Sequence, residues 1–169
     1  MNKYLIIALL VSFSFLGNAQ DTENLSRKEK KALKKAKMIE ETKALLDSKV
    51  YLFDPNRALP SGMRSINLDG TFFAKINKDT LNCYLPYYGR AYSVDYGSNE
   101  GPLNFTQPIQ NYSMEESKKG YTVKFNVKNK NDNINFMFTI SETGSASLNL
   151  NSTNRQSISY HGIIEKPEN

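Results

Sequence analysis

Apolar and polar residues alternate with a period of two along most of the chain after Val50, and this alternation constrains the fold more than any other feature. Successive side chains of a β-strand point to opposite faces, so the alternation predicts strands with one buried face and one solvated face. Turn-forming pairs such as Asp69-Gly70 and Lys119-Gly120 separate the runs. The pattern predicts eight or nine strands and no helix after residue 50. Its clearest apolar runs are Phe72, Ala74 and Ile76; Leu81, Cys83 and Leu85; Tyr121, Val123, Phe125 and Val127; Ile134, Phe136, Phe138 and Ile140; and Ala146, Leu148 and Leu150.

The short connections restrict how these strands pair. A parallel crossover needs about a dozen residues or more, so we expect antiparallel hairpins in a meander. The meander has to bury its apolar face, and closure into a barrel also removes exposed strand edges. We therefore predict a mainly β chain in which residues 50–169 form one antiparallel up-and-down β-barrel. An open sheet with a helix packed across it is the alternative architecture.

The first nineteen residues have the pattern of a secretory signal peptide. A short basic start at Asn2-Lys3 precedes an apolar run from Tyr4 to Leu16, and small residues before Gln20 form a cleavage site. The apolar run is too short to span a bilayer and no stop-transfer segment follows it. No cysteine follows it directly, which excludes a lipid-modified cysteine at the mature N-terminus. We expect a protein without a transmembrane segment, located in the periplasm or secreted.

Residues 20–49 form a separate basic segment that we predict to be helical from 26 to 48. Ser26 and Glu29 have the spacing of a capping box, in which each side chain accepts a hydrogen bond from the other residue's backbone amide. One apolar stripe follows at helical spacing, and within the first half of the helix it contains only alanines, so burial there should be weak. The stripe consists of Leu25, Ala32, Ala36, Ile39, Leu46 and Val50.

Positive charge is concentrated in this helix. Residues 25–49 contain nine lysines and arginines against four acidic residues. A basic amphipathic helix can bind an anionic membrane surface or nucleic acid, and it can equally be the solvated face of a helix docked on the domain. Nucleic acid is not an expected partner outside the cytoplasm. The solvated face of a docked helix is the favoured interpretation, and peripheral contact with a surface or an envelope protein is the alternative.

Single cysteine and histidine residues exclude several classes of site. Cys83 has no partner for an intramolecular disulfide, and its place among alternating apolar residues predicts a buried thiol. His161 continues a polar alternation, so we expect it to face solvent on a strand. One histidine cannot build a two- or three-histidine metal centre. No phosphate-binding glycine loop or nucleophile elbow is present. We expect no enzyme, no catalytic residues, no metal and no cofactor.

The residues Leu85 to Tyr92 read LPYYGRAY and carry the most specific signature of the chain. Together with LFDPNRALPSG at 52–62 and NRQSISYHG at 154–162, this stretch resembles the domain of unknown function 4251 family, small exported proteins of Gram-negative bacteria. The resemblance covers nearly the whole mature chain, although the family commonly has Phe in place of Tyr88. It implies a lipocalin-like β-barrel with no established activity.

The signature stretch has a structural and a functional interpretation. In the first, Pro86 ends a strand, Gly89 permits a bend, and tyrosine hydroxyls satisfy backbone groups around it. In the second, aromatic faces and a guanidinium rim the mouth of a pocket for a small amphipathic or acidic ligand, such as a lipid or glycan fragment. Bulky interior residues argue against a deep cavity and leave a shallow rim site. The candidate ligand-binding residues are Tyr87, Tyr88, Arg90, Tyr92 and Arg155.

Two functional hypotheses follow from these features. The first is a non-enzymatic exported barrel that binds a small ligand or an envelope component at the tyrosine-arginine rim. The second is an interaction or structural envelope protein that acts through the basic helix. An inhibitor of an exported hydrolase is a third possibility that has no positive sign in the sequence.

Overall fold

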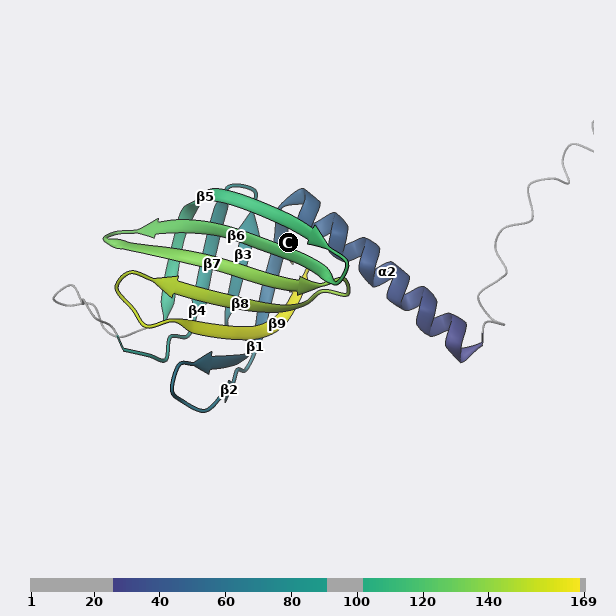
Figure 1. The fold of residues 1–169 in the computed structure, drawn as a ribbon, viewed down its shortest axis with the longest axis horizontal. Helices are drawn as coiled ribbons and strands as arrows, with labels where there is room; N and C mark the ends of the chain where they lie inside the picture. The colour runs from purple at the N-terminus through teal and green to yellow at the C-terminus, as the bar shows by residue number, and fades with distance from the viewer. Residues whose placement is uncertain (1–25, 91–101, 168–169) are drawn as a thin grey trace, which may run out of the picture. The chain divides into compact units, whose positions relative to one another are not determined.

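The computed structural model describes residues 26–90 and 102–167, and this part of the chain holds one helix and nine strands (Figure 1). The elements are α2 (Arg27–Ser48), β1 (Val50–Pro60), β2 (Ile66–Asn67), β3 (Phe73–Asn77), β4 (Thr80–Leu85), β5 (Leu103–Ser117), β6 (Gly120–Asn129), β7 (Asp132–Ser141), β8 (Ser145–Ser152) and β9 (Ile158–Glu165). The predicted helix and the predicted number of strands are both confirmed.

Eight of the strands close into an antiparallel barrel, and the open-sheet alternative is wrong. The strand order is β1-β3-β4-β5-β6-β7-β8-β9, and β1 pairs with β9 to complete the ring. The short strand β2 is additional and pairs only with β1. In Figure 1 the strands β5 to β9 cross in front of β1, β3 and β4, which form the opposite wall.

Strand β1 holds this closure together because it pairs along both of its edges. Its first half pairs with β3, its second half pairs with β2, and its other edge pairs with β9 from Leu52 to Pro60. A bulge interrupts the β1–β9 register between Pro55 and Arg57. Gly162 lies opposite this bulge, where a Cβ atom would collide with the Asp54 carbonyl oxygen. The closing seam therefore requires a residue without a side chain at this position.

Large side chains fill the interior of the barrel, as the alternation predicts. Phe125 stacks on Phe136 with ring centroids 5.0 Å apart, and Phe53 meets Phe138 edge to face at 5.4 Å. Each fully buried side chain of this kind contributes about 1.5–3 kcal/mol through the removal of apolar surface from water. The largest fully buried side chains are Tyr51, Tyr160, Phe53, Phe136, Phe138, Leu46, Ile76, Leu81, Leu85, Ile134, Ile140 and Leu148.

Phe72 differs from its sequence-based placement with Ala74 and Ile76 on a strand. Strand β3 begins one residue later, at Phe73, and Phe72 is only half-buried. Its ring stacks on Tyr84, with centroids 5.4 Å apart. Tyr84 belongs to the outward-facing set of β4, since Cys83 and Leu85 on either side of it are buried. Phe72 therefore lies at the edge of the core and contacts an outward-facing ring, where periodicity alone assigns it to the buried set.

The predicted capping box at the start of α2 is confirmed. The Ser26 backbone amide donates to Glu29 Oε2 at 2.8 Å, and the Glu29 amide donates to Ser26 Oγ at 3.3 Å. These bonds lower the pKa of the Glu29 carboxyl, because the Ser26 groups favour its charged form. No helix of the described residues combines the length and apolar character needed to cross a membrane.

Residues 37–48 of α2 pack on the barrel. Leu46 is 1 % exposed and Thr42 is 5 % exposed, and Lys43 Nζ forms an ion pair with Glu116 Oε2 at 2.8 Å. Thr42 Oγ1 also lies 3.2 Å from the position that a Cβ on Gly144 would occupy. The α2 end of the barrel is therefore sealed by one face of this segment.

Replacing Gly162 with alanine should destabilise the barrel by about 1–3 kcal/mol, because the new methyl group must displace the β1 backbone at Asp54. Urea denaturation followed by far-UV circular dichroism measures this change. The matched control is His161→Ala, whose side chain is exposed on the same strand and should change stability by less than about 0.5 kcal/mol. Equal stabilities for the two variants would show that the seam tolerates a side chain.

Candidate functional site

The signature stretch forms a corner after β4, where the chain leaves the barrel wall. Pro86 is buried, Gly89 is half-buried and Arg90 is exposed. The neighbouring segment is the β8–β9 loop, which brings Gln156 alongside. The Gln156 amide donates to the Arg90 carbonyl at 3.0 Å, and the Arg90 amide donates to Gln156 Oε1 at 3.5 Å. Hydrogen bonds thus join the segment after β4 to the β8–β9 loop, although the two are far apart in sequence.

Tyr87 is the centre of this corner. Its hydroxyl donates to the Gln156 carbonyl at 2.8 Å, and the Arg90 carbonyl lies 3.2 Å from the same oxygen. The Arg155 guanidinium lies over the Tyr87 ring, 5.1 Å from its centroid, which is cation–π geometry. A Cβ atom on Gly89 would lie 2.6 Å from the Tyr87 hydroxyl, so the glycine leaves the space that the phenol occupies.

Tyr160 supports the corner from inside the barrel. It is fully buried and its hydroxyl donates to the Pro86 carbonyl at 2.6 Å, which satisfies a backbone acceptor that water cannot reach. Burial raises the pKa of Tyr160 far above its ordinary value, with smaller contributions from Cys83 and the nearby tyrosines. This phenol therefore stays protonated and acts as a hydrogen-bond donor.

The structure brings together some of the predicted site residues. Tyr87 and Arg155 are in contact, Tyr88 is half-buried against the core, and Arg90 contributes backbone groups to the corner while remaining exposed. Tyr92 lies outside the described residues. The corner therefore contains the tyrosine-to-backbone hydrogen bonds that the structural interpretation predicts. It also contains the guanidinium groups of Arg90 and Arg155.

Two residues of the corner were not among the predicted site residues. The alternation of Ile158, Tyr160 and Ile164 puts Tyr160 on the inner face, but its bond to Pro86 depends on a register that the sequence does not contain. Gln156 carries no local signal, because a glutamine in a loop is compatible with many contacts. Only the hairpin geometry that places it beside Arg90 reveals its role.

The single cysteine and the single histidine of the chain differ in their exposure to solvent. Cys83 is fully buried, and burial raises the pKa of its thiol well above the ordinary value, so the reactive thiolate is suppressed. His161 is exposed on β9, as predicted. Among residues 26–90 and 102–167, no three His, Cys, Asp or Glu side chains gather in a group that could hold a metal ion.

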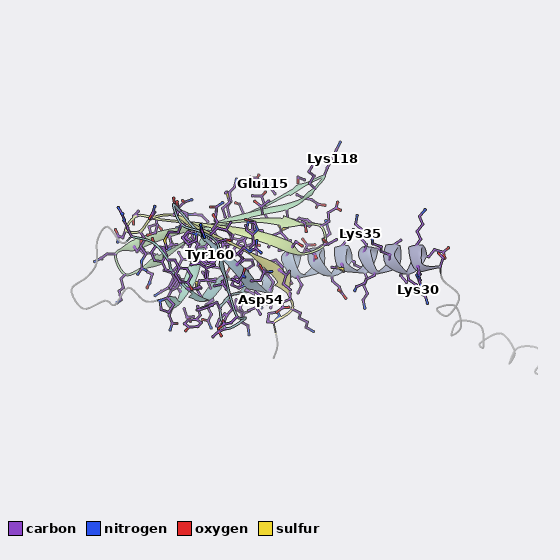
Figure 2. The ribbon with its side chains drawn as sticks, turned by 90° about the horizontal axis from the view of Figure 1, so that it is seen from below. Lys30, Lys35, Asp54, Glu115, Lys118 and Tyr160 are labelled. Carbon is purple, nitrogen blue, oxygen red and sulfur yellow. The ribbon has the colours of Figure 1, made fainter. Side chains whose placement is uncertain are left out.

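A second candidate site is the first half of α2, residues 26–37, which we call the basic half. Every residue of it is exposed, and Glu29 is its only acidic residue. Lys30 and Lys35 project from different sides of the helix (Figure 2). Lys37 pairs with Glu41 at 3.7 Å, and within the described part of the chain the other six basic side chains have no ion pair. The basic residues are Arg27, Lys28, Lys30, Lys31, Lys34, Lys35 and Lys37.

Comparisons with known proteins identify a family and a similar fold but no activity. The family model described as "Domain of unknown function (DUF4251)" matches residues 33–164. The chain is also similar to the crystal structure of a DUF4251 family protein from Bacteroides eggerthii. That likeness has a TM-score of 0.58 and 14 % sequence identity, and it covers 78 % of this chain and 89 % of the other, so it concerns the fold alone. No curated protein matches the chain.

Replacing Tyr160 with phenylalanine should lower the free energy of unfolding by about 1–3 kcal/mol, because it leaves the buried Pro86 carbonyl without a donor. Tyr88→Phe is the matched control, since the Tyr88 ring is only half-buried in the same corner. Urea denaturation at neutral pH provides the comparison. An equal loss of stability in both variants would contradict a specific role for the Tyr160 hydroxyl.

Proposed function

This chain belongs to the DUF4251 family, and we propose that it is an exported, non-enzymatic interaction protein whose basic half binds an anionic surface of the cell envelope. The observation that carries this proposal is the complete exposure of a capped helical segment with seven basic residues and one acidic residue. Burial along α2 begins only at Ile39 and Thr42, so the barrel does not use these side chains for its core. The signal-like residues 1–19 support a location outside the cytoplasm.

The binding that we propose is electrostatic. The apolar side chains of the basic half are Ala32, Leu33 and Ala36, which offer little area for insertion into a bilayer. Each lysine or arginine near an anionic membrane surface contributes about 1 kcal/mol, so a group of this size is sufficient for peripheral attachment. The attraction is screened over a Debye length of about 8 Å at physiological ionic strength, and the attachment should therefore be reversed by salt.

The test compares residues 20–169 with a variant that carries Gln in place of Lys28, Lys31, Lys34 and Lys35. Glutamine has nearly the helix propensity of lysine, so this variant removes charge while preserving the helix. We expect the unaltered protein to sediment with phosphatidylglycerol vesicles at low salt, and we expect the variant to lose at least about tenfold in apparent affinity.

The matched control removes the same amount of charge from the barrel, at the exposed Lys118, Lys119, Lys128 and Lys130. Figure 2 shows Lys118 at the tip of the β5–β6 hairpin. This control should retain most of the vesicle binding. Equal losses in the two variants would show that net charge, and not the basic half, governs the association.

A second candidate function is the binding of a small amphipathic or acidic ligand at the corner. The exposed Arg90 side chain beside the half-buried Tyr87 and Tyr88 favours it, because a guanidinium next to aromatic faces suits a ligand with an acidic group and an apolar part. The backbone of Arg90 already has its partners in Gln156, so truncation of the side chain leaves those bonds intact.

Native mass spectrometry of the protein purified from the envelope of its own host tests this second candidate. We expect a reproducible added mass that disappears in Arg90→Ala, while the thermal midpoint of the variant stays within about 2 °C of the original. Loss of the added mass together with unfolding would make the arginine structural. An unmodified mass for the original protein would contradict ligand binding at the corner.

A further inference from the structure

A cleft of about 450 Å³ lies on the outer face of β1, β3 and β4, and the described residues that line it include none from the corner or the basic half. Its volume is within the range of about 300–1,000 Å³ that is typical of small-molecule sites. The loop before β3 forms one side with Gly70 and Phe72, and the end of β9 contributes Glu165 and Pro167. This face is the solvent side of the barrel wall.

The strand register explains how aromatic and polar residues meet in this cleft. Phe73 is paired with Tyr84, so their outward side chains are neighbours across β3 and β4. In the adjoining row, Lys75 is paired with Leu52 on one side and Asn82 on the other. All of these side chains lie on the face opposite the buried positions of their strands.

Phe72 and Phe73 line one end of the cleft, and both rings contact the neighbouring Tyr84 ring. Phe72 stacks on Tyr84 at 5.4 Å with an interplanar angle of 30°, and Phe73 lies 6.2 Å from the same tyrosine. All three rings are half-buried, which leaves part of each ring open to a ligand. Aromatic rings beside a few polar groups are typical of the lining of a small-molecule site.

Polar groups of both charges surround the rings. Asp54 and Glu165 are acidic, Lys75 is basic, and Asn82 offers both a donor and an acceptor. Asp54 is half-buried on β1, whereas Tyr160 is fully buried inside the barrel. The two carboxylates disfavour an anionic ligand, and Lys75 disfavours a cationic one. A neutral ligand with several hydroxyl groups fits this mixture of donors, acceptors and flat apolar surface.

We propose that this cleft, lined by Asp54, Phe72, Phe73, Lys75, Asn82 and Glu165, binds a neutral oligosaccharide. A pyranose ring has an apolar face of C–H groups that packs on an aromatic ring, and its hydroxyls bond carboxylate, amide and ammonium groups at the rim. Because the cleft is shallow and open, the expected dissociation constant is about 1 mM or somewhat tighter.

Saturation-transfer-difference NMR tests the proposal with residues 20–169 and five soluble probes: maltohexaose, cellohexaose, xylohexaose, mannohexaose and chitohexaose. We expect at least one of these probes to receive saturation, most strongly at its ring C–H protons. The absence of saturation transfer to all five at millimolar concentration would overturn the proposal. Saturation of a polyproline peptide without a response from any sugar would also overturn it, in favour of a peptide site.

Variants distinguish the cleft from other surfaces. Phe72→Ala should weaken oligosaccharide binding by about tenfold without loss of fold, since Phe72 lies outside β3. Asp54→Asn preserves the shape of the cleft while removing one charge-assisted acceptor, and we expect a loss of about fivefold. Circular dichroism and the thermal midpoint establish that each variant is folded.

The matched control is Met137→Ala, which removes an apolar side chain that is 37 % exposed on the outer face of β7. Its binding should equal that of the unaltered protein. Unchanged binding in both Phe72→Ala and Asp54→Asn would overturn the proposal, as would a loss of sugar binding in Arg90→Ala, because the ligand would then lie at the corner. Vesicle binding by the basic half is a separate measurement, so failure of either proposal leaves the other one intact.

Discussion

The pairing of β1 with β9 is the constraint on which the rest of the structure depends. It joins the first and last strands of the meander and turns an amphipathic sheet into a ring with one inside and one outside. The seam contains a bulge at Asn56 and a glycine at Gly162 that allows the two backbones to approach. Once it closes, the inward residues of every strand share one core, and the outward residues are available for surfaces such as the cleft at Phe72.

The two ends of the barrel are closed by different physical means. At the α2 end, Leu46 is buried by an apolar contact, and the Lys43–Glu116 ion pair lies outside it. At the other end, the Tyr87 hydroxyl binds the Gln156 carbonyl and Tyr160 binds the Pro86 carbonyl. Polar closure suits a corner where the chain leaves the sheet, because backbone carbonyls there have no strand partner and need side-chain donors. The same polar closure occupies the tyrosine hydroxyl that a rim ligand would otherwise bind.

Much of the fold follows from local rules that sequence alone can express. The period of two identifies the strands, and the capping box at Ser26 and Glu29 marks the first turn of α2. Buried Cys83 and exposed His161 follow from the same alternation. These rules fail at Phe72. The apolar alternation extends one residue before the start of β3, and the Phe72 ring stacks on the outward-facing Tyr84.

The sequence by itself determined the class of fold, the helix and its cap, and the division of each strand into an inner and an outer face, because these depend on periods of two and 3.6 residues. Only the tertiary structure decided which loops and rows of side chains meet. The contact of Arg155 with Tyr87, the hydrogen bonds of Gln156 with Arg90, and the gathering of β1, β3, β4 and the end of β9 around one cleft all join distant segments. These contacts depend on strand register and barrel closure, and closure is a property of all eight strands together.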